Sequence, residues 1–403
     1  MISLETPRKF RPLVGQAHQV ATEVFRPISR KYDLAEHEYP KELDMLASLI
    51  DGMNAGSDSG AGATGVRREQ SKPSDGANRN GTNLSTVLSV MELCWGDVGL
   101  LLSMPRQGLG NAAIASVASE EQLQRYEGRW AAMAITEPEA GSDSASIRTT
   151  AVLDGDEYVL NGEKIYVTAG ERADLIVVWA TLDRSKGRAA IKSFVVEREN
   201  PGLKLDRLEH KLGIRASDTA AFRLEDCRVP KDDLLGSPTI DVKQGFGGAM
   251  QTFDNTRPLV AAMAVGLTRA CLEETRSQLE RAGVNLDYNA PANTQHAAAA
   301  RLQAMEADYE AAYLLTLQAA WMADNSKPNS LHASMAKAKA GRTCVEVSLA
   351  CVELCGSLGY SETALLEKWA RDAKILDIFE GTQQIQLLIV ARQLLGKTSA
   401  DLR

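Results

Sequence analysis

The chain has 403 residues, which is enough to bury a full core and to form two or three structural lobes. Its net charge of -8 and the lack of any basic run of five residues argue against a nucleic-acid partner. Purely apolar stretches such as 175–180 are far too short to span a bilayer, and the N-terminus has no apolar signal core. We therefore expect a cytoplasmic protein without a membrane span.

Residues 1–130 are expected to form an N-terminal helical domain. Apolar side chains repeat there at helical spacing in four stretches: 8–31, 41–50, 84–102 and 119–127. Residues 51–83 are rich in Gly, Ser, Asn and Asp and have no apolar period, which predicts a flexible, exposed loop.

Residues 131–243 are expected to form a small middle β domain. Residues 158–160 and 163–167 have the pattern of two strands, and Asn161-Gly162 between them predicts a hairpin turn. Runs rich in β-branched and aromatic residues predict further strands at 175–181, 191–196 and 222–224.

Residues 244–403 are expected to form a C-terminal helical bundle. Long amphipathic patterns rich in Ala and Leu predict antiparallel helices at 249–282, 298–323 and 334–355. The order helical, β, helical places the chain in the α+β class.

Glu380 is the strongest candidate for a catalytic residue. It follows the apolar pair Ile378-Phe379, precedes Gly381, and leads into a helix-like stretch at 387–395. A carboxylate among apolar groups is poorly solvated, so its pKa rises and it can act as a base near neutral pH.

A second candidate segment, residues 134–143, lies at the start of the β domain. It offers the hydroxyls of Thr136 and Ser142 together with backbone donors around Gly141. Such groups suit the ring edge and the pyrophosphate of a bound flavin.

Both segments resemble the acyl-CoA dehydrogenases. Phe379-Glu380-Gly381-Thr382 is similar to the catalytic-base segment of that family, and 134–143 is similar to its flavin- and substrate-binding segment. They occur in the family's order and separation, and the resemblance covers most of residues 8–396. It implies the family's fold, with an N-terminal helical domain, a middle β domain and a C-terminal four-helix bundle carrying the base.

The resemblance also implies an activity, the FAD-dependent α,β-dehydrogenation of an acyl-CoA thioester in fatty acid β-oxidation. Glu380 would remove the proton from Cα while a hydride leaves Cβ for the flavin, giving a trans-2-enoyl-CoA. The electrons would then pass to an electron-transfer flavoprotein. Some members carry the base at the position of Thr256, which has no carboxylate here, so Glu380 is assigned as the base.

By the same resemblance, individual residues take roles. Those implied to bind the flavin, some of them that of a neighbouring subunit, are Ile135, Thr136, Ser142, Tyr166, Thr168, Arg281, Gln295, Glu353, Gly356, Thr382 and Gln384. Those implied to contact the substrate or to fix the base-bearing loop are Ser142, Asp254, Arg257 and Gly381.

The chain departs from the family pattern where one subunit completes another's flavin site. Arg281 is present, but the Phe and Gly that usually follow it are replaced by Val284 and Asn285, and Glu353 stands where a glutamine is usual. The assembly is therefore expected to be a homotetramer or a heterotetramer with a related subunit. A non-catalytic or partner-dependent subunit and an oxygen-using acyl-CoA oxidase are the alternatives to the dehydrogenase.

No metal site is expected from the sequence. The six cysteines form no CxxC pair, and none of the five histidines lies at metal-ligand spacing from a cysteine or an acid. His210 is therefore interpreted as structural.

Overall fold

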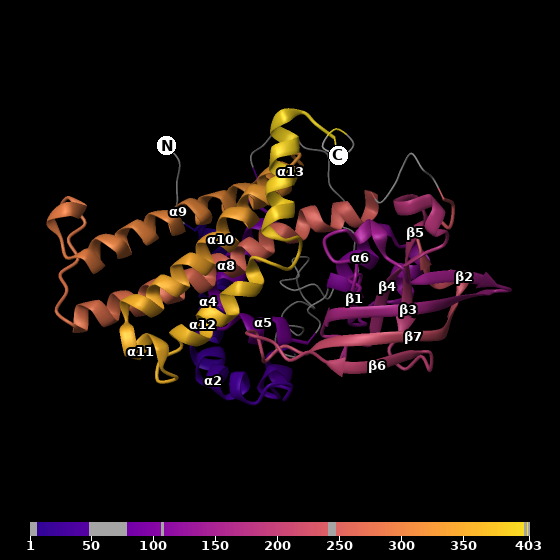
Figure 1. The fold of residues 1–403 in the computed structure, drawn as a ribbon, viewed down its shortest axis with the longest axis horizontal. Helices are drawn as coiled ribbons and strands as arrows, with labels where there is room; N and C mark the ends of the chain where they lie inside the picture. Colours follow the sequence, from indigo (N-terminus) through magenta and orange to yellow (C-terminus); the bar gives the residue numbers. More distant parts are fainter. Residues whose placement is uncertain (1–5, 48–78, 106–108, 241–246, 399–400, 402–403) are drawn as a thin grey trace.

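A computed structural model describes residues 6–47, 79–105, 109–240, 247–398 and 401, with the backbone alone described at 247–255. The molecule is elongated, with a β-sheet toward one end and long helices toward the other (Figure 1). Among the N-terminal helices, α4 packs on the long helices α8 and α9, whereas α6 packs on strands β1 and β4. The predicted order of helical, β and helical regions is confirmed.

The N-terminal region is helical, as its apolar period predicts. Its helices, with a π-turn at Ala21–Phe25, are α1 (Arg11–Val20), α2 (Arg26–Leu34), α4 (Thr82–Gly96), α5 (Val98–Ser103), α6 (Leu109–Val117) and α7 (Glu120–Arg125). Residues 42–47 are also helical. The start of α7 is fixed by a capping box, in which the side chains of Ser119 and Gln122 each bond the other's backbone.

The predicted loop 51–83 ends earlier than expected. Residues 51–78 lie outside the described residues, and α4 already begins at Thr82. The Asp324 carboxylate, at the end of α9, accepts the backbone N–H groups of Gly81, Asn83 and Leu84 at 2.7–3.1 Å. This cap comes from a residue about 240 positions away, so no local pattern could have indicated it.

The middle region forms a single mixed sheet of eight strands. They are β1 (Ala131–Ala134), β2 (Thr150–Asp154), β3 (Glu157–Thr168), β4 (Leu175–Thr181), β5 (Ile191–Glu197), β6 (Leu203–Leu208), β7 (Thr219–Pro230) and β8 (Leu234–Leu235). The order is β6-β7-β3-β2-β4-β5-β8, and β1 pairs with β4 in parallel. Strand β4 is buried on both faces: Ile176 and Val178 enter one core cluster, whereas Leu175 and Val177 enter another that includes Ile114 of α6.

The predicted hairpin turn at Asn161-Gly162 is wrong. Strand β3 runs without a turn from Glu157 to Thr168, and the reversal lies between β2 and β3, where Gly155 has φ 63°. A Cβ on Gly162 would lie 2.4 Å from the Oγ1 atom of Thr149, so the glycine allows close approach of the backbone. The pairing of β3 with β7 shifts register at this point.

The C-terminal region consists of α8 (Gly247–Arg281), α9 (Ala297–Asp324), α10 (Ser330–Leu354), α11 (Gly356–Tyr360), α12 (Leu366–Leu376) and α13 (Gln383–Leu395). Helices α8, α9 and α10 pack on one another, and α12 packs on α8 and α10. Helix α8 also packs closely on α4 at Gly266. A Cβ on this glycine would lie 2.2 Å from the Met91 carbonyl oxygen. Helix α13 packs on α10 and runs in a different direction from the long helices (Figure 1).

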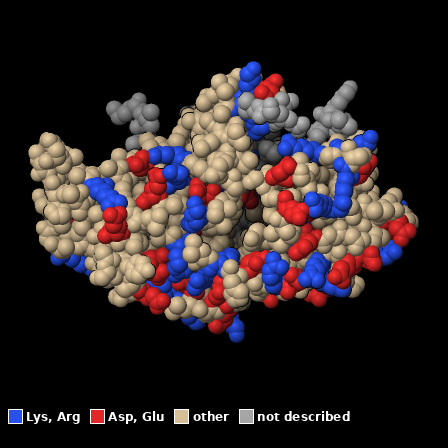
Figure 2. All heavy atoms as spheres, viewed as in Figure 1, with Lys and Arg blue, Asp and Glu red and all other residues tan. Residues whose placement is uncertain are grey.

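Acidic and basic side chains are interspersed over the face drawn in Figure 2. This distribution does not resemble the continuous basic surface that binds nucleic acid. In the described part of the chain, no helix combines the length and the apolar character needed to cross a bilayer.

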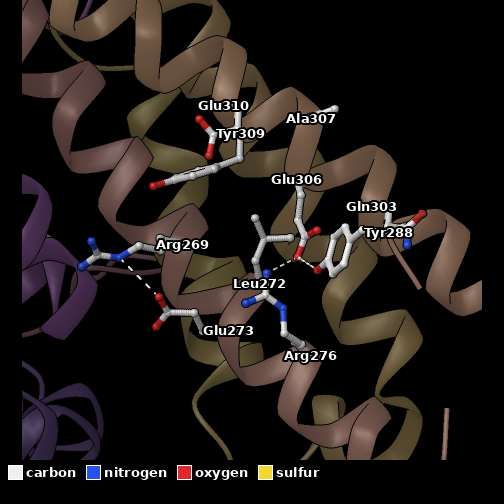
Figure 3. A pocket seen from close by; sticks show the side chains of 10 residues that line it. All are labelled: Arg269, Leu272, Glu273, Arg276, Tyr288, Gln303, Glu306, Ala307, Tyr309 and Glu310. Carbon is white, nitrogen blue, oxygen red and sulfur yellow. Dashed lines mark hydrogen bonds and ion pairs between the residues drawn. The ribbon is translucent and has the colours of Figure 1, made fainter. Parts of the chain in front are cut away.

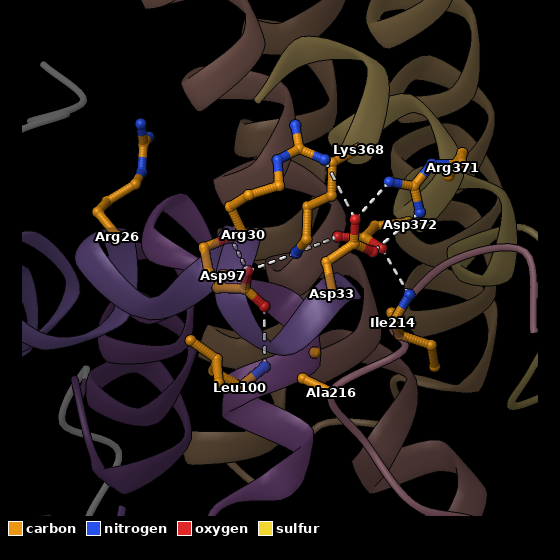
Figure 4. Close-up of polar contacts among 12 residues, drawn as sticks. Arg26, Arg30, Asp33, Asp97, Leu100, Ile214, Ala216, Lys368, Arg371 and Asp372 are labelled. Carbon is orange, nitrogen blue, oxygen red and sulfur yellow. Dashed lines mark hydrogen bonds and ion pairs between the residues drawn. The ribbon is translucent and has the colours of Figure 1, made fainter. Parts of the chain in front are cut away.

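A buried ion cluster, Asp97-Lys368-Asp372, joins the three regions (Figure 4). The Lys368 ammonium, 1% exposed, pairs with Asp97 and, at 2.7 Å, with Asp372. Asp97 also accepts the Leu100 N–H at 2.8 Å, and Asp372 accepts the Ile214 N–H, at 2.5 Å, from the segment that precedes β7. Charges taken this far out of water are tolerated only when each is paired and hydrogen-bonded.

Replacement of Lys368 by Met should destabilise the fold strongly. Asp97 and Asp372 would remain buried without their cation, and we expect a loss of roughly 3–5 kcal/mol in the free energy of unfolding. Lys374→Met is the matched control on the same helix, because Lys374 is exposed and its pair with Asp377 should contribute at most about 1 kcal/mol. Urea unfolding of both variants tests this, and equal losses would contradict it.

Candidate active site

Glu380 lies in a strained turn between α12 and α13. Its φ is 55°, in the left-handed region that residues other than glycine rarely adopt, and Gly381 follows with φ 91°. Backbone strain of this kind persists only where the surrounding structure enforces it, and it is common at functional sites.

Two buried side chains hold this turn through its carbonyl groups. The Lys337 Nζ, on α10, donates to the Gly381 carbonyl at 2.7 Å. The Gln386 Nε2, on α13, donates to the carbonyls of Glu380 at 3.1 Å and Gly381 at 3.2 Å. Both side chains are fully buried, and burial lowers the pKa of Lys337 to about 8. The turn is therefore fixed from two helices.

The Glu380 carboxylate faces the start of α8. The Thr256 hydroxyl donates to its Oε2 atom at 2.9 Å, and Arg257 is buried beside it. Burial raises the pKa of Glu380, while the Thr256 hydrogen bond and the charges of Arg257 and Lys337 limit the rise. The raised pKa expected from the sequence is thus confirmed, and the arrangement suits a general base. Asp254, the other predicted substrate contact on α8, has a side chain outside the described part of the chain.

The predicted flavin residues of the β domain come together at the ends of β1 and β3. Ile135 and Thr136 directly follow β1, and the Thr136 carbonyl accepts the Ile165 N–H of β3 at 2.9 Å. Tyr166 lies on the same strand with φ 58° and is 61% exposed, although Ile165 is buried. Thr168, which ends β3, is half-buried.

Ser142 is exposed in the segment that leads from β1 towards β2. An exposed aromatic ring with hydroxyl groups near it offers stacking and hydrogen bonds to a planar heterocycle. The donor set of this region therefore fits a flavin.

A buried ion pair that the sequence did not reveal fixes this segment. The Lys164 Nζ, 0% exposed, pairs with Glu137 at 2.7 Å and donates to the Ile135 carbonyl at 3.2 Å. Glu137 also accepts the backbone N–H groups of Arg148 and Thr149. Burial lowers the pKa of Lys164 to about 8. Burial opposes ionisation of Glu137, but Lys164 and the hydrogen bonds outweigh it and lower the pKa of Glu137.

Four of the remaining predicted cofactor residues lie far from Glu380: Arg281, Gln295, Glu353 and Gly356. Arg281 ends α8, 25 residues after Thr256, which corresponds to roughly 37 Å along one helix. Exposed Glu353, near the end of α10, pairs with Arg301 of α9 at 2.7 Å, and Gly356 begins α11 with φ 54°. Gln295 precedes α9 and bonds the carbonyl of Ala290. Glu353 follows Lys337, which bonds the Glu380 turn, by 16 residues, or roughly 24 Å along α10, so Arg281 and Glu353 cannot reach this turn in their own chain.

A cleft of about 500 Å³ lies between α8 and α9 in this remote region (Figure 3). Its wall includes Glu306, which pairs with Arg276 and accepts the Tyr288 hydroxyl at 3.1 Å. Charged, aromatic and aliphatic side chains line the cleft together, and none of them belongs to the turn that carries Glu380.

Thr382 and Gln384 follow the Glu380 turn directly. The Thr382 hydroxyl caps α13 by accepting the Ile385 N–H at 3.4 Å, and the Gln384 side chain is exposed. Thr382 thus has a structural role at the helix start, and Gln384 is accessible to a neighbouring molecule.

Among the buried groups of the site, Lys337 had a signal in the sequence that could have been used. It lies on the face of α10 that carries Ala333, Ala336 and Ala340, all fully buried or nearly so. A lysine at a core position of an amphipathic helix indicates a buried partner. Glu137 and Lys164 have no comparable pattern, because their pairing depends on the sheet.

Comparison with known proteins decides the family. The mitochondrial short-chain specific acyl-CoA dehydrogenase of Bos taurus is 33% identical over 400 residues, covering 98% of this chain and 92% of the relative. The chain belongs to the acyl-CoA dehydrogenase family. The family models of the acyl-CoA dehydrogenase middle domain and C-terminal domain match residues 132–227 and 243–395.

Solved structures agree with the assignment of this chain to the acyl-CoA dehydrogenase family. The butyryl-CoA dehydrogenase of Megasphaera elsdenii has a TM-score of 0.83 at 30% identity, with 98% of this chain and 100% of that chain covered. A chain in a structure of the electron transferring flavoprotein of Acidaminococcus fermentans has a TM-score of 0.79 at 32% identity, with 98% and 100% covered. The protein is thus an oxidoreductase of a family of FAD-dependent flavoproteins, as the sequence predicted.

The hydrogen bond from Thr256 should set the pH dependence of this acyl-CoA dehydrogenase. If Glu380 is the base, as the family resemblance implies, it must be ionised to accept a proton, so the rate of substrate-dependent flavin reduction should fall as the pH drops through its raised pKa. Thr256→Val removes the donor that stabilises the carboxylate, and we expect the acid limb to move up by about one pH unit. Thr256→Ser keeps the hydroxyl and should leave the limb in place. An unchanged limb in Thr256→Val would contradict this interpretation.

Proposed function

We propose that this dehydrogenase converts an acyl-CoA thioester to the trans-2-enoyl-CoA, with Glu380 as the base that takes the proton from Cα. The observation that carries the proposal is the Glu380 carboxylate itself. It combines a raised pKa, a strained turn held by Lys337 and Gln386, and an orienting hydrogen bond from Thr256. A scaffold protein would gain nothing from a poorly solvated carboxylate in such a turn.

The weakly acidic α-proton requires stabilisation of the charge that develops on the thioester oxygen. We assign this role to the backbone N–H of Glu380, which lies in the turn held by the bonds to the carbonyls of Glu380 and Gly381. A donor fixed before the reaction needs no reorganisation during it, so it favours the transition state over the ground state.

In this proposal, FAD supplies the acceptor for the hydride that leaves Cβ. Ile135, Thr136, Ser142, Tyr166 and Thr168 would hold it in the same protomer. The flavin of a neighbouring subunit would be contacted by Arg281, Gln295, Glu353, Gly356, Thr382 and Gln384. The distance of Arg281, Gln295, Glu353 and Gly356 from Glu380 in their own chain supports this assignment. Ser142, Asp254, Arg257 and Gly381 would bind the substrate or support the base-bearing turn.

The electron acceptor in our proposal is an electron-transfer flavoprotein. The likeness to a chain solved under the name of the Acidaminococcus fermentans electron transferring flavoprotein supports it.

Short, straight acyl chains are the first substrates to test, because the bovine relative is described as short-chain specific. Fast aerobic reoxidation of the substrate-reduced protein would instead favour an oxidase.

Glu380→Gln should abolish the reaction while leaving flavin binding intact. Loss of a positioned base should lower the rate of flavin reduction by butyryl-CoA by at least roughly 10²–10⁴-fold. Stopped-flow absorbance under anaerobic conditions measures this rate, and the flavin spectrum reports binding separately. Glu346→Gln, at an exposed residue of α10 paired with Arg342, should react as the wild type. A Glu380→Gln variant with unchanged turnover would refute the assignment.

The segment after Arg281 lacks the Phe and Gly with which family members usually complete a neighbouring subunit's flavin site. We propose a tetramer, formed either by this chain alone or with a related subunit that supplies the missing flavin contacts. If the partner is required, the purified chain should carry clearly less than one FAD per protomer and regain it when the related subunit is added. Mass photometry with flavin absorbance measures both quantities. A stable homotetramer with one FAD per protomer would exclude the heteromer.

A further inference from the structure

Three side chains with metal-ligating atoms meet at the junction between the N-terminal helices and the sheet. They are Glu36 and His37, just beyond the end of α2, and His210, in the segment between β6 and β7. One ligand atom from each lies within 4.8 Å of the other two. The Nδ1 atom of His210 is 3.0 Å from the Oε2 atom of Glu36, and the two imidazole rings are 4.9 Å apart, centroid to centroid. This cluster was not predicted from the sequence, because Glu36 and His210 are 174 residues apart.

His37 has a strained backbone and an unsatisfied side chain. Its φ is 72°, in the left-handed region that is unfavourable for residues other than glycine. Both ring nitrogens are buried, and neither has a hydrogen-bond partner among the described residues. Imidazole nitrogens shielded from water in this way are normally satisfied by a donor, an acceptor or a metal ion.

The Glu36 carboxylate is already oriented as a ligand. Its Oε1 atom accepts the backbone N–H of Lys211 at 3.0 Å, which leaves Oε2 directed at His210. A hydrogen bond to the second oxygen is the usual support for a ligating carboxylate. Two cations lie near the cluster, and both donate to backbone carbonyls: the Lys211 ammonium to Ser217 at 2.9 Å and the Arg215 Nε to Lys211 at 3.0 Å.

We propose that Glu36, His37 and His210 form a binding site for a divalent transition-metal ion of the Zn²⁺ class. Two imidazoles and one carboxylate are a common ligand set for Zn²⁺, and one or two coordination positions would remain for water. Ligand atoms around a tetrahedral ion lie about 3.4 Å apart. In the structure, the ligand atoms of the three side chains lie within 4.8 Å of one another, which is wider than this distance. The His210 side chain is 82% exposed, so it can rotate and bring its ring nitrogen closer to the other two ligand atoms.

Such an ion has a structural consequence. It would fasten the end of α2 to the β6–β7 segment, where the Ile214 N–H bonds Asp372 on α12. Gly213 of that segment packs so closely on the Arg371 backbone that a Cβ would lie 2.5 Å from it. The metal site therefore acts on the same junction as the Asp97-Lys368-Asp372 cluster and does not depend on the proposed reaction.

Metal binding to the full-length protein, dialysed against a chelator and then freed of it, tests the proposal. We expect one Zn²⁺ per protomer by isothermal titration calorimetry, and visible absorption bands of low-coordinate Co²⁺ when Co²⁺ is used as the probe. At a hundredfold excess over Kd, Zn²⁺ should raise Tm by roughly 2–6 °C.

Two variants and one matched control decide the outcome. His210→Ala, at an exposed position, and His37→Asn, which tolerates a positive φ, should each weaken binding at least tenfold. His18→Ala should bind as the wild type, since His18 also lies beside a carboxylate, Glu92 at 2.9 Å, but belongs to no such cluster among the described residues. No stoichiometric binding by the wild type, or equal binding by either of the two cluster variants, would overturn the proposal.

Discussion

The pairing of one buried lysine with two buried aspartates holds the regions of this acyl-CoA dehydrogenase together. Lys368 contributes from α12 and Asp97 from the start of α5, and Asp372 accepts the Ile214 N–H of the segment between β6 and β7. Because none of these charges is accessible to water, each element must stay in place for the others to remain paired. Glu380, the proposed base, follows Asp372 by eight residues and therefore lies close to this cluster along the chain.

Buried lysines recur where the chemistry needs a fixed backbone. Lys337 holds the Gly381 carbonyl beside Glu380, and Lys164 holds the Ile135 carbonyl and Glu137 beside the proposed flavin site. In each case an ammonium group with little or no solvent contact satisfies main-chain or carboxylate oxygens. A fixed backbone matters here because the proposed donors to the substrate are main-chain N–H groups, which only the local fold can orient.

The sequence predicted the order of regions, the long helices α8, α9 and α10, and a carboxylate with a raised pKa at Glu380. These depend on local patterns, namely helical period and apolar flanks. The sequence did not predict the features that depend on contacts between residues far apart in the chain. Asn161-Gly162 is typical of a turn, but contact with Thr149 keeps it within a strand, and the cap on α4 comes from Asp324. The pairs of Lys164 with Glu137 and of Glu36 with His210 likewise exist only once the sheet has formed.

In the proposed reaction, Glu380 and the flavin region of the β domain together oxidise an acyl-CoA. The decisive experiment is an anaerobic titration of the purified, FAD-loaded protein with acyl-CoAs of increasing length. Flavin absorbance should bleach with at least one thioester, in equal proportion to the trans-2-enoyl-CoA formed. A protein that binds FAD in full but whose flavin no saturated acyl-CoA bleaches would contradict the proposed reaction.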